Sequence, residues 1–458
     1  MSSRKVIYAL IAIVVVLFFT LSVNMMMEEI LSTGLFVYLL LNFIDSIGKS
    51  YKPLDIPILL ALFQCMLMPA IVYHVYNDDA LVIALKYDMG VTAETYYSFM
   101  FPAILAMMAG IKIPELLQSS YTTKFFIAVH QTKNYLTGKG NIGILLMIIG
   151  FVSGLMQIFI PGELKYVAYL FSKLLYVGVL YTYFSDSKNR TLYLGVGVVS
   201  ILAQSIAQAM FGELIYTLVL AVLLLLLGKK IKNSFKFGIA IVGIVFVMLI
   251  QSIKADYRSV AWGKQSDESN KTEAFFSLIS ERIANPGRFF DWSLMFPTVN
   301  RFNQGVIVGK VMEHIPNFAP FAEGETIFTT LAASFVPRLL WPDKPLAGGH
   351  ANMERFTGFI IQGYSMNISP MGEAYGNFGV GGGIVFMFFY GLFFATIIYF
   401  LLNTIRKRPT LILWFPVLFL NAVQIETDIL MCVNSIIKNL MFIWFCYWAA
   451  NKFLRLKL

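Results

Sequence analysis

Long runs of apolar residues recur from one end of the chain to the other, separated by short polar segments. A run of about 20 apolar residues can cross a bilayer as a helix that satisfies its own backbone hydrogen bonds. The pattern predicts twelve spans, at about 6–24, 30–48, 54–76, 96–113, 141–160, 164–184, 191–211, 213–228, 236–253, 380–403, 410–430 and 435–451. No run shows the two-residue alternation of a strand. The sequence therefore predicts an all-α polytopic membrane protein.

Composition agrees with this pattern. Charged residues make up 13% of the 458 residues and hydrophobic residues 58%, whereas soluble domains have roughly 25% charged residues. Cys65, Cys432 and Cys446 all fall in or at the ends of hydrophobic runs, so we interpret them as packing residues and expect no disulfide framework.

Lys and Arg are distributed unevenly between the two sets of short loops. Twenty of them lie in the termini and loops on one side of the predicted spans, against Lys86, Lys165 and Lys438 in the short loops opposite. The richer side is predicted to be cytoplasmic, which places both termini inside. The net charge of +9 therefore reflects membrane topology, and no nucleic-acid partner is implied.

One large polar segment interrupts the hydrophobic pattern, between the ninth and tenth predicted spans. It divides the chain into spans 1–9 at residues 1–253, an extracytoplasmic loop at 254–379, and spans 10–12 at 380–458. The loop contains eleven basic and twelve acidic residues, so it is no plain basic patch. Glu273–Ile283 and Arg301–His314 have amphipathic helical periodicity. We expect a mostly helical loop that lies as a lid over the bundle.

Two cations mark the point where the chain leaves the membrane after span 9. Lys254 and Arg258 are four residues apart and share one helix face. Such a face suits a diphosphate group, because guanidinium forks match phosphate oxygens and lysine adds a point charge. The alternative is that both side chains snorkel to lipid phosphates.

The loop also carries a cation in apolar, proline-rich surroundings. Arg338 lies within Phe335-Val-Pro-Arg-Leu-Leu-Trp-Pro-Asp-Lys-Pro345, where an unpaired charge would be costly. A ligand phosphate would neutralise it, with Lys344 as a second cation. A salt bridge to Asp343 or Glu373 is the structural alternative.

Glu373 is the first candidate for a general base. It lies between two glycines just before span 10, near Tyr375 and Asn377, and partial burial would raise its pKa. It could instead be a helix-start residue favoured by the helix dipole. His350 and Asp343 are the other candidates. The sequence has no metal-ligand spacing, nucleophile elbow or nucleotide-binding loop, so we predict neither a metal nor a cofactor.

These features together resemble the Wzy-type O-antigen polymerases, which are integral-membrane class C glycosyltransferases. The resemblance rests on many spans with one large late loop, on Arg301, on the Phe335–Pro345 segment, and on Gly372-Glu-Ala-Tyr-Gly-Asn-Phe-Gly379. Arg338 followed by Gly349 also looks like the family's pattern of arginine, ten residues and glycine. The motif resemblance covers about Arg301 to Gly379.

The resemblance implies a polymerase that transfers a glycan en bloc from undecaprenyl diphosphate to another lipid-linked repeat unit, on the outer face of the bacterial inner membrane. The diphosphate is the leaving group, so no nucleotide sugar or ATP is needed. A flippase and a chain-length regulator of the same pathway are the implied partners. The implied diphosphate-binding residues are Lys254, Arg258, Arg301, Arg338 and Lys344; the implied base is Glu373, with Asp343 and His350 as rivals; and the acceptor contacts are Trp341, Tyr375 and Asn377.

Two other functions remain open at this stage. An O-antigen ligase uses the same donor but attaches the glycan to a lipid core. A transporter or flippase also commonly has twelve spans, but no internal repeat is visible here. Such a transporter would need ionisable residues at mid-membrane positions, and Lys173, Glu426 and Asp428 are the few that the sequence offers.

Overall fold

Helices and turns make up the computed structural model, and its described residues include no strand. The structure describes residues 3–79, 82–83, 87–117, 121–157, 159–209, 211–261, 268–285, 287, 299–336, 340–341, 344, 349–361, 366–453, 455–456 and 458. The prediction of an all-α polytopic protein is confirmed at this level.

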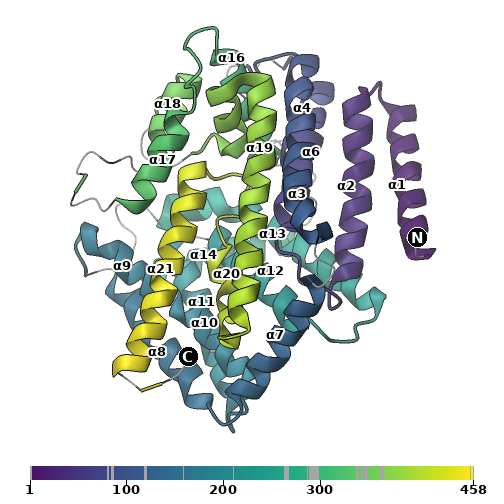
Figure 1. Cartoon of the computed structure of the whole chain (residues 1–458). Coiled ribbons are helices and arrows are strands. Elements are labelled where there is room, and N and C mark those ends of the chain that lie inside the picture. Colours follow the sequence, from purple (N-terminus) through teal and green to yellow (C-terminus); the bar gives the residue numbers. More distant parts are fainter. Residues whose placement is uncertain are drawn as a thin grey trace.

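The first half of the chain consists of antiparallel helices (Figure 1). They are α1 (Ser3–Ser22), α2 (Met27–Ser46), α3 (Asp55–Leu62), the π-helix η1 (Phe63–Leu67), α4 (Met68–Val75), α6 (Ala93–Leu117), α7 (Tyr121–Leu136), α8 (Gly140–Met156), α9 (Gly162–Ser172), α10 (Leu174–Phe184), α11 (Arg190–Gln208), α12 (Phe211–Leu226) and α13 (Asn233–Ala261).

The large polar segment and the C-terminal part contribute the remaining elements. They are α14 (Glu268–Ala284), α16 (Gln304–His314), α17 (Glu325–Phe335), α18 (His350–Thr357), α19 (Ser369–Ile405), the 3₁₀ helix η3 (Pro409–Trp414), α20 (Phe415–Leu418) and α21 (Ile429–Phe453). We call α16, α17 and α18 the lid helices. They lie together at one end of the bundle, where α16 contacts α4, η1 and α19, and α17 contacts α21 (Figure 1).

Within the described residues, nine helical segments are long and apolar enough to cross a membrane, and ten if one bent pair is a single span. Nine of the twelve predicted spans match these segments. The predicted span 141–160 corresponds to α8, which meets α7 at a bend of 97°. The predicted span 213–228 corresponds to α12, which has 16 residues.

The predicted span 410–430 differs most from the structure. It consists of η3, α20 and turns up to Asp428, which together we call the broken segment (409–428). Its side chains are mostly buried, and Thr132 Oγ1, Cys432 Sγ and Asn439 Nδ2 donate to its backbone carbonyls. Non-helical backbone at membrane depth is tolerated where protein surrounds it. The apolar residues of the broken segment are therefore explained by burial among other helices of the protein, without a continuous membrane-spanning helix.

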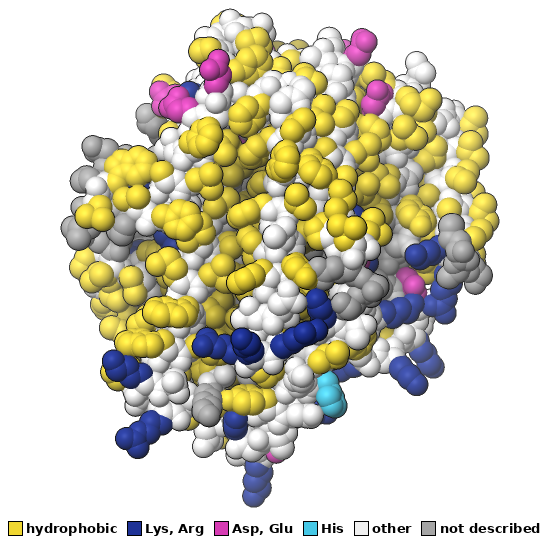
Figure 2. All heavy atoms as spheres, in the orientation of Figure 1, with side chains coloured by type: hydrophobic (Ala, Val, Ile, Leu, Met, Phe, Trp, Pro, Cys, Tyr) yellow, Lys and Arg dark blue, Asp and Glu magenta, His cyan; other side chains and the backbone are white. Residues whose placement is uncertain are grey.

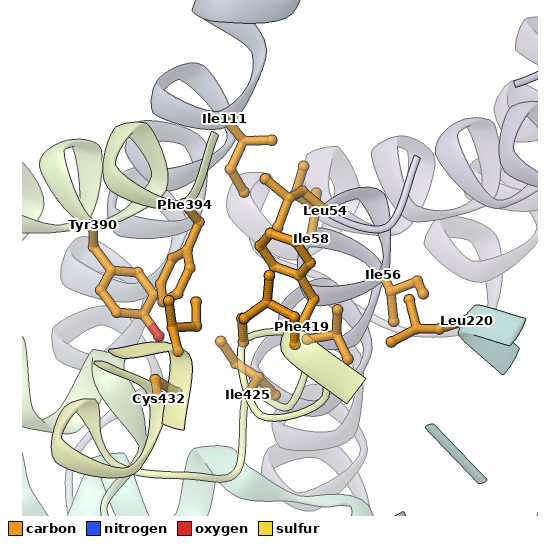
Figure 3. Packing of buried hydrophobic residues seen from close by; sticks show 14 of the residues in the cluster. Leu54, Ile56, Ile58, Ile111, Leu220, Tyr390, Phe394, Phe419, Ile425 and Cys432 are labelled. Carbon is orange, nitrogen blue, oxygen red and sulfur yellow. The ribbon is translucent and has the colours of Figure 1, made fainter. Parts of the chain in front are cut away.

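Two glycines allow α6 and α19 to approach closely in the centre of the bundle. A Cβ at Gly110 would collide with the Phe388 carbonyl, and a Cβ at Gly391 would collide with the Met107 carbonyl. Small residues permit such backbone contact between membrane helices. Figure 3 shows the neighbouring core, where Phe394 of α19 lies near Ile111 of α6 and Phe419 of the broken segment.

The boundaries of the polar segment differ from the prediction. Helix α13 continues to Ala261, and α19 begins at Ser369 rather than at residue 380. Gly379, with φ of 66° and ψ of −160°, interrupts α19 at the expected boundary. Glycine adopts this left-handed backbone without steric cost, so the helix can change direction there.

The distribution of charge agrees with the predicted topology. On the face shown in Figure 2, Lys and Arg gather towards the lower end, and Asp and Glu gather towards the upper end, where the lid helices lie in Figure 1. The orientation in a membrane stays a prediction from the distribution of Lys and Arg.

Candidate functional site

Three cations from two separate segments lie close together. Lys254 and Arg258 are on the last turns of α13, and Arg301 is in the short segment before α16. Lys254 lies within electrostatic range of both arginines, and burial followed by the Arg301 guanidinium lowers the pKa of Arg258. We call these three residues the cation cluster. The structure thus brings together three of the five predicted diphosphate-binding residues.

Within the described part of the chain, no carboxylate forms an ion pair with Lys254 or Arg301. The nearby Asp256 is engaged by Arg282, whose Nη2 lies 3.0 Å from Asp256 Oδ2. Like charges at short range destabilise one another. The cation cluster is therefore suited to an anionic ligand.

One carboxylate of the broken segment is near Lys254 of the cation cluster. Glu426 is partly buried and lies within electrostatic range of Lys254. Its Oε2 accepts a hydrogen bond of 3.3 Å from Gln64 Nε2, and its Oε1 accepts one of 3.3 Å from Tyr216 Oη. Neutral donors at this distance orient the carboxylate and leave lone pairs free for a proton.

The π-helix η1 explains how Gln64 reaches Glu426. A π-helix changes the facing of its side chains and leaves carbonyls without their α-helical partners. Tyr96 Oη donates to the Cys65 carbonyl at 2.8 Å, and Tyr97 Oη donates to the Met66 carbonyl at 3.3 Å. These two buried tyrosines of α6 therefore stabilise the conformation that directs Gln64 towards Glu426.

Glu373 lies in a different environment from the membrane rim that the sequence predicts. It is fully buried in the first turns of α19, and its Oε2 accepts the backbone N–H of Ile429, the first residue of α21, at 3.1 Å. Asp428 is also buried and lies within electrostatic range of it. We call Glu373 and Asp428 the carboxylate pair. The glycines that flank Glu373 in the sequence did not indicate that its side chain would be buried.

The residues near Glu373 serve internal contacts in this structure. Asn377 is buried, donates to Thr326 Oγ1 at 2.7 Å and accepts from the Gly324 N–H at 3.1 Å, which ties α19 to the start of α17. The ring of Tyr375 packs edge-on against Phe99 and Phe321. Further along α19, the Tyr390 hydroxyl is directed towards Cys432 of α21 (Figure 3).

The structure also locates most of the other predicted residues of the large segment. Lys344 is buried, and its Nζ donates to the Val336 carbonyl at 2.8 Å. His350 is exposed at the start of α18, with Nδ1 3.1 Å from the Ile361 carbonyl. Trp341 is partly buried, and its carbonyl accepts from the Lys344 N–H. Arg338 and Asp343 lie outside the described residues.

Glu426 and Gln64 are the site residues that sequence reasoning missed. Glu426 stood out only as an acid inside a predicted span, which is a signal of a functional residue in membrane proteins. Gln64 gave no signal, because nothing in its neighbouring sequence indicates a π-helix.

A family model for a domain of unknown function (DUF8712) matches residues 103–400. The chain belongs to this family. The matched part contains the cation cluster and Glu373, whereas Gln64 and Glu426 lie outside it. No curated protein and no solved structure matches the chain.

Proposed function

We propose that this protein is a glycosyltransferase of the outer face of the bacterial inner membrane, which polymerises lipid-linked oligosaccharide repeat units of O-antigen or a related surface polysaccharide. The observation that carries the proposal is that Lys254 lies within electrostatic range of Arg258, Arg301 and the Glu426 carboxylate. The resemblance of the segment Arg301 to Gly379 to the Wzy-type polymerases supports the choice of substrate.

The charges fit a lipid diphosphate donor. Each phosphate of a polyprenyl diphosphate glycan carries a negative charge, and the cations of Lys254 and Arg301 have no ion-pair partner among the described carboxylates. As the bond from the anomeric carbon to the diphosphate oxygen breaks, negative charge grows on the leaving group. Pre-positioned cations stabilise this growing charge, and each such group is worth about 2.7–4 kcal/mol in well-studied enzymes.

Proton transfer completes the reaction. The attacking hydroxyl of the acceptor glycan forms the new bond to the anomeric carbon, the polyprenyl diphosphate leaves with the electron pair, and the hydroxyl proton passes to a carboxylate. We assign this role to Glu426, because its carboxylate is partly exposed and lies near Lys254 of the cation cluster. Glu373, the base proposed from sequence, is fully buried against the Ile429 N–H and would need α19 and α21 to separate first. Direct displacement would invert the anomeric configuration.

Ionisable groups inside the bundle favour a transporter as the second candidate. Lys173 is buried and forms an ion pair with Glu213, which also accepts a hydrogen bond from Tyr169 Oη at 2.9 Å. Buried pairs of this kind mark ion or substrate pathways in many transporters.

A deletion strain complemented with single variants tests the proposal. Loss of the polymerase leaves single repeat units on the lipid core, loss of a ligase leaves unattached long polymer, and loss of a flippase leaves lipid-linked units facing the cytoplasm. We expect Glu426→Gln to lower chain elongation by about 100- to 10,000-fold, as for loss of a general base, and to give the polymerase phenotype.

Glu373→Gln is the matched control, since it removes a carboxylate from the same part of the bundle. We expect it to retain most elongation. If Glu373→Gln abolishes elongation while Glu426→Gln does not, the assignment of the base to Glu426 is wrong. If the deletion gives the flippase phenotype, the proposed activity is wrong.

A further inference from the structure

Three amide side chains have buried polar atoms without hydrogen-bond partners among the described residues. These atoms are Gln64 Oε1, Gln251 Oε1, and both Oδ1 and Nδ2 of Asn300. A buried polar atom without a partner costs about 1–3 kcal/mol, so such atoms are uncommon in the absence of a ligand or water. Together, Gln64, Gln251 and Asn300 form what we call the amide group.

Each member of the amide group is near a residue of the candidate site, either along the chain or through a hydrogen bond. Gln251 is three residues before Lys254 and seven before Arg258, so all three project from one face of α13. Asn300 directly precedes Arg301. Gln64 donates its Nε2 to Glu426, which leaves its Oε1 as an acceptor beside the same carboxylate.

The chemistry of these atoms differs from that of the cation cluster. Amide carbonyl oxygens accept hydrogen bonds, so they do not attract a phosphate. They complement hydroxyl donors, and the Asn300 amide both accepts and donates, as a sugar hydroxyl does. We propose that the amide group is a pyranose-binding subsite, which holds the sugar attached directly to the diphosphate. This inference rests on the proposed function.

The subsite would also give the cation cluster its specificity. A diphosphate site alone would bind polyprenyl diphosphate, the product, as tightly as the glycosylated donor. Amide acceptors left unpaired by the product would favour the donor, because a site built to hydrogen-bond a hydroxyl discriminates strongly against a ligand that lacks it.

Binding to the purified full-length protein in detergent tests the inference. The probes are farnesyl diphosphate and farnesyl diphosphate linked to glucose, galactose or N-acetylglucosamine. We expect at least one glycosylated probe to bind about tenfold more tightly than the bare diphosphate. Gln64→Met and Gln251→Met should each reduce this gain by about threefold to tenfold, as for one lost hydrogen bond, and leave the affinity for bare diphosphate within about twofold.

Gln204→Met is the matched control. Gln204 also has a buried Nε2 without a partner in the described residues, but it lies on α11 against Gly154 of α8. It should leave both affinities unchanged. The inference is overturned if no sugar improves binding, if the Gln64 and Gln251 variants behave like Gln204→Met, or if both probes weaken equally. If the bare diphosphate fails to bind the parent protein, the proposed function itself fails, and the inference fails with it.

Discussion

At the scale of single residues, the account depends on which charges are available to a ligand. Lys254 lies within electrostatic range of Arg258 and Arg301, whereas Lys344 donates to the Val336 carbonyl and Glu373 accepts from Ile429. Sequence reasoning identified Lys254 and Arg258, because a basic helix face at the end of a span is visible in the sequence, and the family resemblance supplied Arg301. It could not distinguish buried from accessible carboxylates, because that difference arises from contacts with distant segments.

The Arg301 guanidinium should contribute directly to diphosphate binding. Arg301→Gln is expected to weaken binding of farnesyl diphosphate by about 10- to 100-fold, the usual value for a lost charge-assisted hydrogen bond. The affinity of the parent protein should also fall as salt rises. Arg355→Gln removes an arginine that pairs with Glu325 at 2.8 Å on the lid helices, and it serves as the control. Equal affinities of the two variants would contradict a role for Arg301.

The Glu373 carboxylate should contribute to stability through the start of α21. Glu373→Gln keeps an oxygen that accepts from the Ile429 N–H and removes a charge near Asp428, so it should unfold at a temperature at or above that of the parent. Glu373→Leu leaves the N–H unpaired and should be less stable by about 1–3 kcal/mol. Thermal unfolding in detergent measures both. A glutamine variant less stable than the leucine variant would contradict this role.

At the scale of elements, two interruptions build the candidate site. The π-helix η1 directs Gln64, and the broken segment carries Glu426 in the part of the chain that just precedes α21. Hydropathy predicted a continuous span at both places, because it measures how apolar a segment is and is insensitive to its hydrogen-bonding pattern. Tyr96, Tyr97 and Asn439 supply the donors that make these interruptions possible, and they are far from them in the sequence.

Tyr96 and Tyr97 should influence activity, because their hydroxyls hold η1 in the conformation that positions Gln64. Tyr96→Phe removes the donor to the Cys65 carbonyl and should destabilise the protein by about 1 kcal/mol. It should also lower chain elongation, because Gln64 and Glu426 lose their alignment. Tyr73→Phe removes a donor to the Val91 carbonyl, which lies outside η1, and is the control. If Tyr96→Phe loses stability but elongates chains normally, η1 has no positioning role.

At the scale of the whole molecule, the distribution of Lys and Arg predicts that the end of the bundle with the lid helices faces outward. Among the described residues, nine predicted spans coincide with helices long and apolar enough to cross a membrane, since long apolar helices need no distant contact to be recognised. The length of α12 and the buried path of the broken segment depend on how neighbouring helices surround them, and the sequence alone did not show this.

The topology can be tested with an impermeant thiol reagent. The three native cysteines are buried, so background labelling should be low. A cysteine at Asn317, exposed between α16 and α17, should react in intact cells, whereas one at Lys188, between α10 and α11, should react only after the membrane is opened. The reverse pattern would place the cation cluster on the cytoplasmic side and remove the basis of the proposed reaction.

The most direct test of the central claim is the reaction itself, with the purified protein in vesicles and a polyprenyl-diphosphate-linked oligosaccharide as both donor and acceptor. We expect mass spectrometry to show a ladder of products that differ by whole repeat units, each on one lipid diphosphate, with one free polyprenyl diphosphate released for each bond formed. The Glu426→Gln variant should bind the donor but form product about 100- to 10,000-fold more slowly. Binding of the donor by the parent protein without any ladder, or its passage across the membrane unchanged, would contradict the account.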